Sequence, residues 1–460
     1  MSQKLSRRDF LKVASASTAA ASLGGFATPM LVAASPPAQD ATTISFMGWG
    51  GVAEDEGVRA AIDVFQSEQS AVQVEWLHTP DNYNEKLLSN VAAGTPPDTA
   101  FISQSQFRTL VHDGLTMDIT ELVEADPIIS APDYFIEPQE TERSTDGMGH
   151  WYGIGSTWTA LHFFFNEALL EEAGVEPPTF TEGGIWDWDT FVENARLLTK
   201  DSAGRHPGDD GFDVNDVVQW GVFMASNWWM MYDAMAKTNG GQMSADGLMT
   251  LDTPEAMAGI QAFADLIHVH QVMPEAVFLD ELGMSASQMI ETGRLAMTID
   301  GSWVLADVAA VEPPLGVGPI PQLVSSGLDA GQGHLHTVLN GSQNPEAAWS
   351  WLSFLAKPFY QTHFCKLGLW IPNQTAMLTE EGLDGWITEG VHPENYRAFV
   401  ADYIPQYISP TIVPAGYPRA EALFVPAIEQ VMAGTAQATD VIPDVIAQAN
   451  EILQAEYIDS

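Results

Sequence analysis

The chain has 460 residues, with 17 Lys and Arg against 61 Asp and Glu, so its formal net charge is −44 at pH 7. This charge excludes nucleic acid as a partner and disfavours an anionic membrane face, because both repel an acidic surface. The scarcity of basic residues also argues against an anionic ligand, which Arg and Lys usually hold. A saline habitat would explain the charge, since such a surface stays soluble in strong salt, and so would an acidic lineage.

The single cysteine, Cys365, excludes an intramolecular disulfide and a multi-cysteine metal site. We expect it to be a small buried hydrophobic residue. Residues 33–36, at the end of the N-terminal apolar stretch, contain no cysteine, so a lipid anchor of the bacterial lipoprotein kind is not expected.

The N-terminal residues 6–12, SRRDFLK, resemble a twin-arginine export signal. A weakly apolar stretch follows from Val13 to Ala34, and small residues at 32–34 offer a cleavage site. We therefore expect residues 1–40 to be a signal peptide and linker, and the mature protein to be soluble in the periplasm or another extracytoplasmic space. An uncleaved membrane helix is the alternative.

The mature chain of about 420 residues predicts two domains or lobes. Residues 44–47 alternate as a strand that runs into the loop 48–51, and a helix follows with Val58, Ile62 and Phe65 on one face. A second strand pattern covers residues 72–76. Short apolar strands that alternate with amphipathic helices predict a layered α/β protein.

Later helices carry start signals. Thr253-Pro254 and Asn344-Pro345 each place a capping residue before a proline at the first helical position. We expect the apolar faces of these helices, and of a terminal helix over residues 442–453, to pack in the core. They carry Met257, Ile260, Phe263 and Ile267, then Trp349, Leu352 and Leu355, and finally Ile442, Val445, Ala449 and Leu453.

Several motifs occur in a fixed order along the chain: residues 90–98 (NVAAGTPPD), 151–154 (WYGI), 165–174 (FNEALLEEAG), 239–241 (NGG), 293–297 (GRLAM), 301–303 (GSW) and 344–349 (NPEAAW). Together they resemble the extracellular solute-binding protein family that the maltose-binding protein typifies. The resemblance covers nearly all of the mature chain. The family binds many ligands, so the resemblance does not name one.

The resemblance implies a periplasmic-binding-protein fold of type II, with a hinge that the chain crosses about three times and a ligand cleft between two lobes. Matching motifs place the crossings near Thr157, Gly318 and Pro345. Lobe 1 would then comprise residues 41–157 and 318–345, and lobe 2 residues 158–317 and 346–460. Closure on a ligand that touches both lobes is the implied motion.

A sugar offers an apolar C–H face and a rim of hydroxyls, so its site needs flat aromatic rings and polar groups at the ring edge. Trp303 matches the family's stacking aromatic, and one of Trp228 and Trp229 is expected to face the cleft while the other packs in the core. Trp49 follows the first strand between glycines, and Trp370 lies in a loop after a helix. Trp158 follows the first crossing and is a further candidate at the hinge.

For the sugar hydroxyls we nominate Gln104 and Ser105, because the strand that ends at residue 102 brings them to the cleft edge. Asp300 is a candidate acceptor, and Asn82 and Tyr83 are candidates from the first lobe. The loop 103–106 lacks the charged residue of the maltose binders, so maltose specificity is not expected to carry over.

We therefore expect a monomeric substrate-binding subunit of an ABC importer that captures a neutral carbohydrate or polyol, delivers it to a membrane permease and catalyses nothing. A glycerol phosphodiester or a polyamine is the alternative ligand, and a secreted carbohydrate-active hydrolase the alternative class. Among the histidines, only 268–270 and 334–336 show alternating spacing, and no third metal ligand is apparent. No cofactor is expected, although the acidic loop 209–216 leaves a structural calcium site open.

Overall fold

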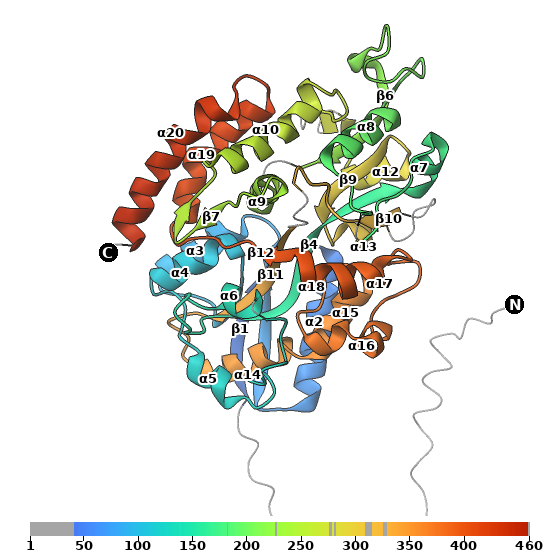
Figure 1. The fold of residues 1–460 in the computed structure, drawn as a ribbon. Coiled ribbons are helices and arrows are strands. Elements are labelled where there is room, and N and C mark those ends of the chain that lie inside the picture. The colour runs from blue at the N-terminus through green and yellow to red at the C-terminus, as the bar shows by residue number, and fades with distance from the viewer. Residues whose placement is uncertain are drawn as a thin grey trace, which may run out of the picture. The chain divides into compact units, whose positions relative to one another are not determined.

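The computed structural model describes residues 41–458 except 138, 182, 226–227, 276–277, 280–281, 309–314 and 325–328. The predicted signal peptide at residues 1–40 thus lies outside the described residues. Ten of the described strands form one sheet with helices packed around it, as the predicted α/β class requires (Figure 1). Among the described helices, none combines the length and the apolar character needed to cross a membrane.

One half of the sheet is built around β1 (Thr42–Gly48). It pairs in parallel with β2 (Val72–His78) and with β3 (Thr99–Ile102), and the connections are α2 (Val52–Glu68) and α3 (Tyr83–Ala92). Parallel strands place their carboxyl ends at one edge of a sheet, so the loops that follow β1 and β3 lie at the same edge.

The long strand β4 (Ile154–Asn166) joins the two halves of the sheet. It pairs antiparallel with β11 (Asp329–Val338) as far as Ala160, and with β9 (Leu295–Gly301) from Leu161 onward. All 13 of its residues are buried, because both faces of this part of the sheet are covered.

The strand order is β2-β1-β3-β11-β4-β9-β6-β5, with β10 beside β4 and β12 beside β11. The remaining strands are β5 (Lys200–Asp201), β6 (Val217–Met224), β10 (Leu315–Gly318) and β12 (Ile408–Pro410), and a separate hairpin consists of β7 (Ser244–Ala245) and β8 (Leu248–Met249).

Among the described residues, buried apolar side chains form three clusters. The first core surrounds β1–β3 and takes its residues from 44–154 and 335–370. The helices of its region are α4 (Gln104–His112), α5 (Thr120–Ala125), α6 (Gln139–Ser144), α14 (Pro345–Leu355) and α15 (Pro358–Lys366).

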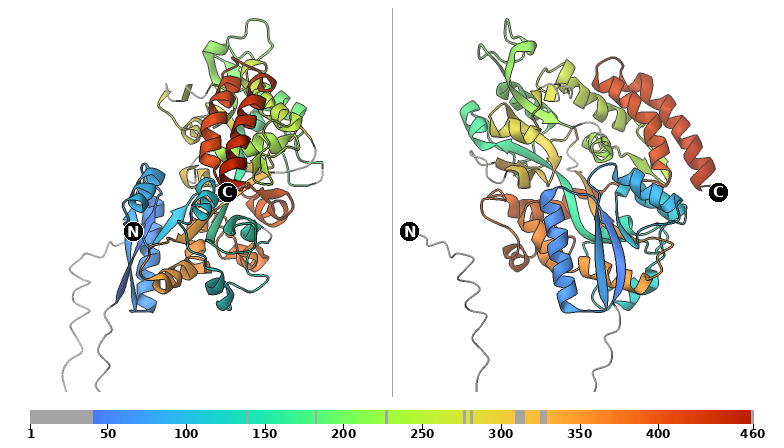
Figure 2. Two further views of the ribbon diagram at one scale, coloured as in Figure 1. Left: turned by 90° about the vertical axis from the view of Figure 1, so that its left-hand side faces the viewer. Right: turned by 180° about the vertical axis from the view of Figure 1, so that it is seen from behind.

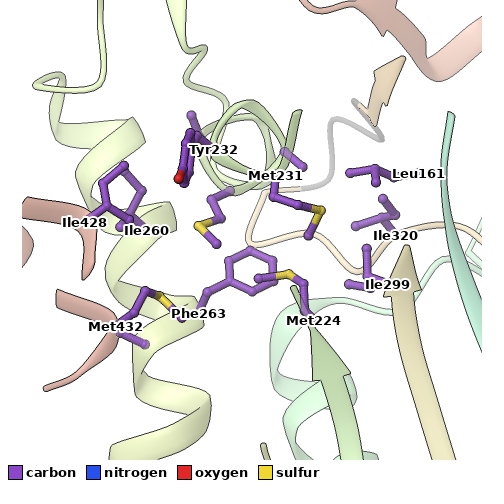
Figure 3. Close-up of a cluster of buried hydrophobic side chains, with 14 of the residues drawn as sticks. Leu161, Met224, Met231, Tyr232, Ile260, Phe263, Ile299, Ile320, Ile428 and Met432 are labelled. Atoms are coloured by element: carbon purple, nitrogen blue, oxygen red, sulfur yellow. The ribbon is translucent and has the colours of Figure 1, made fainter. Parts of the chain in front are cut away.

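The second and third cores lie on opposite faces of β4, β6 and β9, because side chains alternate along a strand. Phe163 and Phe165 of β4 belong to the second core, and Phe164 between them belongs to the third. Figure 3 shows part of the second core, where Met224 of β6 and Ile299 of β9 lie near Phe263.

Helices from distant parts of the chain cover these two cores. The second core contains residues of α7 (Glu167–Ala173), α8 (Trp188–Leu198), α9 (Trp229–Thr238), α10 (Pro254–His268), α19 (Tyr417–Met432) and α20 (Ala438–Leu453). α19 and α20 run side by side (Figure 2). The third core contains residues of α12 (Ala286–Glu291), α13 (Val304–Val308), α16 (Glu380–Asp384), α17 (Tyr396–Ala398) and α18 (Ile404–Tyr407). Single turns occur at η1 (Val214–Asp216), η2 (Thr375–Leu378), η3 (Phe399–Tyr403) and η4 (Gln454–Ile458).

The packing differs from the predicted division into lobes at two places. α14 and α15 pack against α2 in the first core, whereas the motifs assigned residues 346–366 to the second lobe. Ile320 belongs to the second core, and the Leu323 amide donates to Thr238 O at 2.9 Å, so this segment stays with α9. The reason is that Trp351, Leu352 and Ile320 each bury against the nearest apolar face, which motif spacing does not reveal. The hinge positions themselves stay predictions.

The two proline start signals are confirmed as helix starts. Thr253 caps α10, because its hydroxyl accepts a hydrogen bond from Ala256 N at 3.3 Å. α14 begins at Pro345 as predicted, but the Asn344 side chain makes no capping bond. Most of the expected faces are buried, and in α20 Ile446 is buried more deeply than the predicted Val445.

Candidate functional site

The indole rings of Trp228, Trp303 and Trp370 meet where the three cores adjoin. The centroid of the Trp303 ring lies 5.5 Å from that of Trp228 and 6.4 Å from that of Trp370, and both pairs are inclined rather than parallel. Trp303 is half-buried and packs against the first and third cores, while Trp228 packs against the second and Trp370 belongs to the first. We call these three residues the tryptophan cluster.

The neighbouring Trp229 occupies the first position of α9 and has only 8% of its surface exposed within the second core. Its ring lies edge-on to Trp228, with 6.2 Å between the centroids. Trp228 is half-buried and just precedes the helix. Of the predicted pair, then, Trp229 is the core residue and Trp228 joins the cluster.

The turn after β9 fixes the orientation of Trp303. A Cβ atom at Gly301 would lie 2.3 Å from the Trp303 ring, so the absence of a side chain allows the indole to fold back over the strand. Asp300 accepts a hydrogen bond from Gly301 N at 2.7 Å and a second one from Trp303.

Asp300 sits in an environment that disfavours its charge. Burial raises the pKa of Asp300 to about 6, and the nearby Asp307 adds to the effect, while the two hydrogen bonds oppose it. A half-buried carboxylate beside an aromatic ring can accept hydrogen bonds from the hydroxyls of a stacked sugar.

Trp49 lies at the carboxyl end of β1, as predicted from its place between glycines. Its ring is edge-on to those of Tyr83 and Phe101, with centroids 4.9 and 5.3 Å away. The loop is held by His78, whose ring nitrogen Nε2 lies 2.9 Å from Gly50 O. Gly50 has a φ of 121°, which favours glycine there.

Tyr83 and Asn82, the other first-lobe candidates, have different surroundings. The Tyr83 hydroxyl lies 2.6 Å from Phe101 O and 3.1 Å from Met47 O, and burial raises its pKa well above the ordinary value. The Tyr83 ring therefore packs against Trp49, and its hydroxyl is hydrogen-bonded to backbone carbonyl oxygens. Asn82 is exposed before α3, with a φ of 52°.

Gln104 and Ser105 form the first turn of α4, immediately after β3. Both are buried, at 4% and 9% exposure. The Gln104 amide donates weakly to Arg143 O at 3.4 Å, and the Ser105 hydroxyl lies 2.8 Å from that of Ser103. The carbonyl oxygen of the Gln104 side chain has no hydrogen-bond partner among the described residues.

Trp158 lies within β4 and is only 3% exposed. The Arg143 guanidinium lies over its ring, 4.7 Å from the centroid. Arg143 is itself completely buried and paired with Glu140, with 2.9 Å between Arg143 Nε and a carboxylate oxygen. Trp158 thus lies inside the crossing strand, away from solvent.

No motif in the sequence indicated that Arg143, Glu140 and Glu54 are buried charged residues. Arg143 and Glu140 lie in the short helix α6, which carries no strong pattern. Glu54 lies in the first turn of α2 close to Gly50, and burial raises its pKa to about 8. Glu54 and Asp55 both lie in the first turn of α2, where acidic side chains commonly interact with the helix dipole, so nothing in the sequence marked Glu54 as buried.

Two cavities, of about 380 and 400 Å³, adjoin Arg108. Arg108 of α4, Gly247 of the β7–β8 hairpin and Pro414 line both. None of the eleven predicted site residues lines either cavity. The residues that line these cavities come from segments far apart in the sequence, so no local motif could predict the cavities.

The acidic loop 209–216 uses its carboxylates within the chain. Asp209 accepts from His206 N at 2.8 Å, and Asp213 from Asn215 N at 3.0 Å. Across the described residues, no group of three or more His, Cys, Asp or Glu side chains is placed to hold a metal ion.

Comparison with known proteins gives two family matches. Residues 4–24 match the twin-arginine translocation signal sequence, which directs export. Residues 49–362 match the bacterial extracellular solute-binding protein family. The second match covers more than half of the chain.

Individual relatives are more distant. The chain is 24% identical over 278 residues to an arabinooligosaccharide-binding protein of Halalkalibacterium halodurans, a match that covers 59% of this chain and only 57% of that protein. The fold of the present chain is similar to that of an ABC substrate-binding protein of Listeria monocytogenes in complex with cycloalternan. The TM-score is 0.75 and the sequence identity 18%, and the match covers 90% of this chain and 99% of that one. A maltose-bound MalE3 of T. maritima has a similar fold, with a TM-score of 0.71 and 18% sequence identity. That match covers 90% of this chain and 100% of MalE3.

These neighbours are binding proteins that share the two-lobed fold expected from the motifs. The α/β sheet of the structure is consistent with the family match over residues 49–362. The chain is an exported member of the bacterial extracellular solute-binding protein family.

Proposed function

We propose that this protein is the substrate-binding subunit of an ABC importer and captures a neutral carbohydrate at the tryptophan cluster. The observation that carries the proposal is that Trp228, Trp303 and Trp370, from segments far apart in sequence, meet at the junction of three cores. Aromatic rings there can stack on the C–H faces of a sugar. Asp300 and Trp49 would add a hydroxyl acceptor and a ring from the edge of the first core.

Two further lines of support concern the ligand. Relatives and structural neighbours bind arabinooligosaccharide, cycloalternan and maltose, according to their names. The mature chain carries about 13 Lys and Arg, too few to favour a phosphate or carboxylate ligand. We further propose that a monomer closes its two halves on the sugar, passes it to membrane permease subunits, and performs no catalysis.

A ligand screen tests this proposal. Thermal melting is recorded with arabino- and malto-oligosaccharides, cyclic glucans, monosaccharides, polyols, glycerol phosphodiesters and polyamines. A ligand at 100 times its dissociation constant adds about 2.7 kcal/mol to the folded state, which raises the melting temperature visibly. Stabilisation by phosphodiesters or polyamines alone would contradict the carbohydrate assignment, and consumption of a sugar during the assay would contradict the absence of catalysis.

The Trp303→Ala variant tests the location of the site. We expect at least a tenfold loss of affinity, about 1.4 kcal/mol, because one stacking ring is removed. Trp349→Ala is the matched control, since Trp349 is also half-buried but lies on α14 in the first core. Equal affinity of both variants for the sugar, measured by calorimetry, would place the site elsewhere.

A further inference from the structure

A chain of buried hydroxyls links the turn that carries Trp303 to the loop that carries Trp370. Ser302 and Thr159 are both fully buried. The Ser302 hydroxyl donates to Leu369 O at 2.8 Å, one residue before Trp370. The Thr159 hydroxyl lies 2.8 Å from the Ser302 hydroxyl, and Ser302 N lies 3.4 Å from Thr159 Oγ1.

The number of protons that the hydroxyls can donate fixes the direction of these hydrogen bonds. A hydroxyl has one proton to donate, and Ser302 gives its proton to Leu369 O. Thr159 must therefore donate to Ser302 Oγ, while its own oxygen accepts from Ser302 N. No other assignment satisfies all three contacts, so loss of the Ser302 hydroxyl leaves both Leu369 O and the Thr159 hydroxyl without this partner.

The chain of hydroxyls sits where β4 passes from one half of the sheet to the other. On adjacent residues of β4, Trp158 exchanges backbone hydrogen bonds of 2.6 and 2.8 Å with Ile371, and Thr159 meets Ser302. Leu161, two residues further, pairs with Gly301 of β9. The turn 300–303 and the loop 369–371 are thereby both attached to one short stretch of β4.

We propose that Ser302 is a positioning residue that holds Trp303 and Trp370 as one preassembled platform on the crossing strand. The proposal deepens the proposed function and rests on it as far as ligand binding is concerned. Preassembly lowers the cost of ordering two large side chains when a ligand arrives. It also makes the two rings move together with β4 instead of adjusting separately.

The test compares Ser302→Ala with a matched control on β9, the strand that leads into the turn of Ser302. Thr298→Val is the control, because Thr298 is fully buried on β9 and its hydroxyl donates to Phe223 O at 3.0 Å, away from the turn. Each variant loses one buried hydroxyl. Closely spaced indoles give an exciton couplet in circular dichroism, and the Trp370→Phe variant shows the share of the Trp303–Trp370 pair.

We expect Ser302→Ala to lose the same share of the couplet as Trp370→Phe and to bind the sugar at least tenfold more weakly. Thr298→Val should keep both properties despite a similar loss of melting temperature, and Ser302→Thr should restore them by keeping the hydroxyl. A Ser302→Ala variant that is less stable but retains couplet and affinity would overturn the proposal.

Two further outcomes are distinguishable. If Ser302→Ala does not fold, Thr159→Val decides, since it removes the hydroxyl that holds Ser302 against β4, and an unchanged couplet would then refute the role. If no compound binds the unaltered protein, the proposed function fails, whereas the couplet measured without ligand still decides whether Ser302 positions the rings.

Discussion

Hydrogen bonds and burial have opposite effects on the pKa of Asp300. Its carboxylate accepts hydrogen bonds from Gly301 N and Trp303, yet burial and Asp307 raise its pKa to about 6. The folded state therefore keeps a proton on Asp300 at pH values between about 4 and 6, where the unfolded chain has released it. The contribution of Asp300 to the free energy of unfolding is largest below pH 4 and is lost as the pH rises to about 6.

This pH dependence of the free energy of unfolding gives a prediction for Asp300→Asn. Above pH 6 the variant should be more stable than the natural protein by up to about 3 kcal/mol, because the neutral amide avoids a charge that the site disfavours. The difference should shrink as the pH falls to 4. Urea unfolding at pH 4 to 8 measures it, with the exposed Asp252→Asn as control. A difference that does not depend on pH would contradict the account.

The same substitution should act on binding in the opposite direction. If Asp300 accepts sugar hydroxyls, Asp300→Asn weakens affinity at pH 7 even though the fold is more stable. A site that costs stability is a common feature of binding and catalytic positions.

Among the secondary-structure elements, the short helix α6 is held to the first residues of β4 by buried polar groups. Glu140 of α6 accepts hydrogen bonds from Arg143 and from Gly155 N of β4 at 2.7 Å, and Asn373 donates to it at 3.0 Å. Arg143 also donates to Thr157 O at 3.3 Å. These groups are buried, so the pair is stable only while every partner stays in place.

A double-mutant cycle tests this network. Arg143→Met should lower the free energy of unfolding by about 3–5 kcal/mol, because it leaves the Glu140 carboxylate buried without its cation. Adding Glu140→Gln should recover part of the loss, since no uncompensated charge remains. The exposed pair of Arg196 and Glu193 is the control cycle, for which less than about 1 kcal/mol is expected. Losses that simply add in the buried cycle would contradict coupling.

At the scale of the whole molecule, the net charge dominates. Removal of the signal takes away four basic residues and one acidic residue, so the mature net charge is about −47. Thirteen basic side chains cannot pair with 60 acidic ones, and most carboxylates on the surface therefore repel one another.

We expect the melting temperature to rise by several degrees between 0.1 and 1 M NaCl. The Debye length falls from about 10 to about 3 Å over this range, and the mutual repulsion is screened. Neutralising the exposed Glu68, Asp210 and Glu389 to the corresponding amides should reduce the dependence on salt. A melting temperature that falls with added salt would show that repulsion does not limit stability.

The fold was predictable from local patterns where one segment decides its own structure. The alternation at residues 44–47 gave a strand, and Thr253-Pro254 gave the start of α10, because period and capping depend on neighbours in sequence. Asn344 shows the limit of this reasoning, since Pro345 starts α14 without a bond from the Asn344 side chain.

The candidate site was predictable only in part. The sequence named Trp228, Trp303 and Trp370, and the structure brings these three together. The sequence did not distinguish the cluster residue Trp228 from the core residue Trp229. Nor did it show that the Tyr83 hydroxyl is hydrogen-bonded to Phe101 O. Both depend on which distant segment packs against the residue.

The sequence by itself determined the export signal, the α/β class, the strong acidity and the membership in a solute-binding family, because composition, period and motif order are local or additive properties. Only the tertiary structure decided that α14 and α15 belong to the first core, that Arg143 is buried over Trp158, and that Ser302 joins the loops of two tryptophans. Each of these results from contacts between segments that are far apart in sequence, from 15 residues for Arg143 and Trp158 to 286 for Phe65 and Trp351, and such contacts are set by packing of the whole chain.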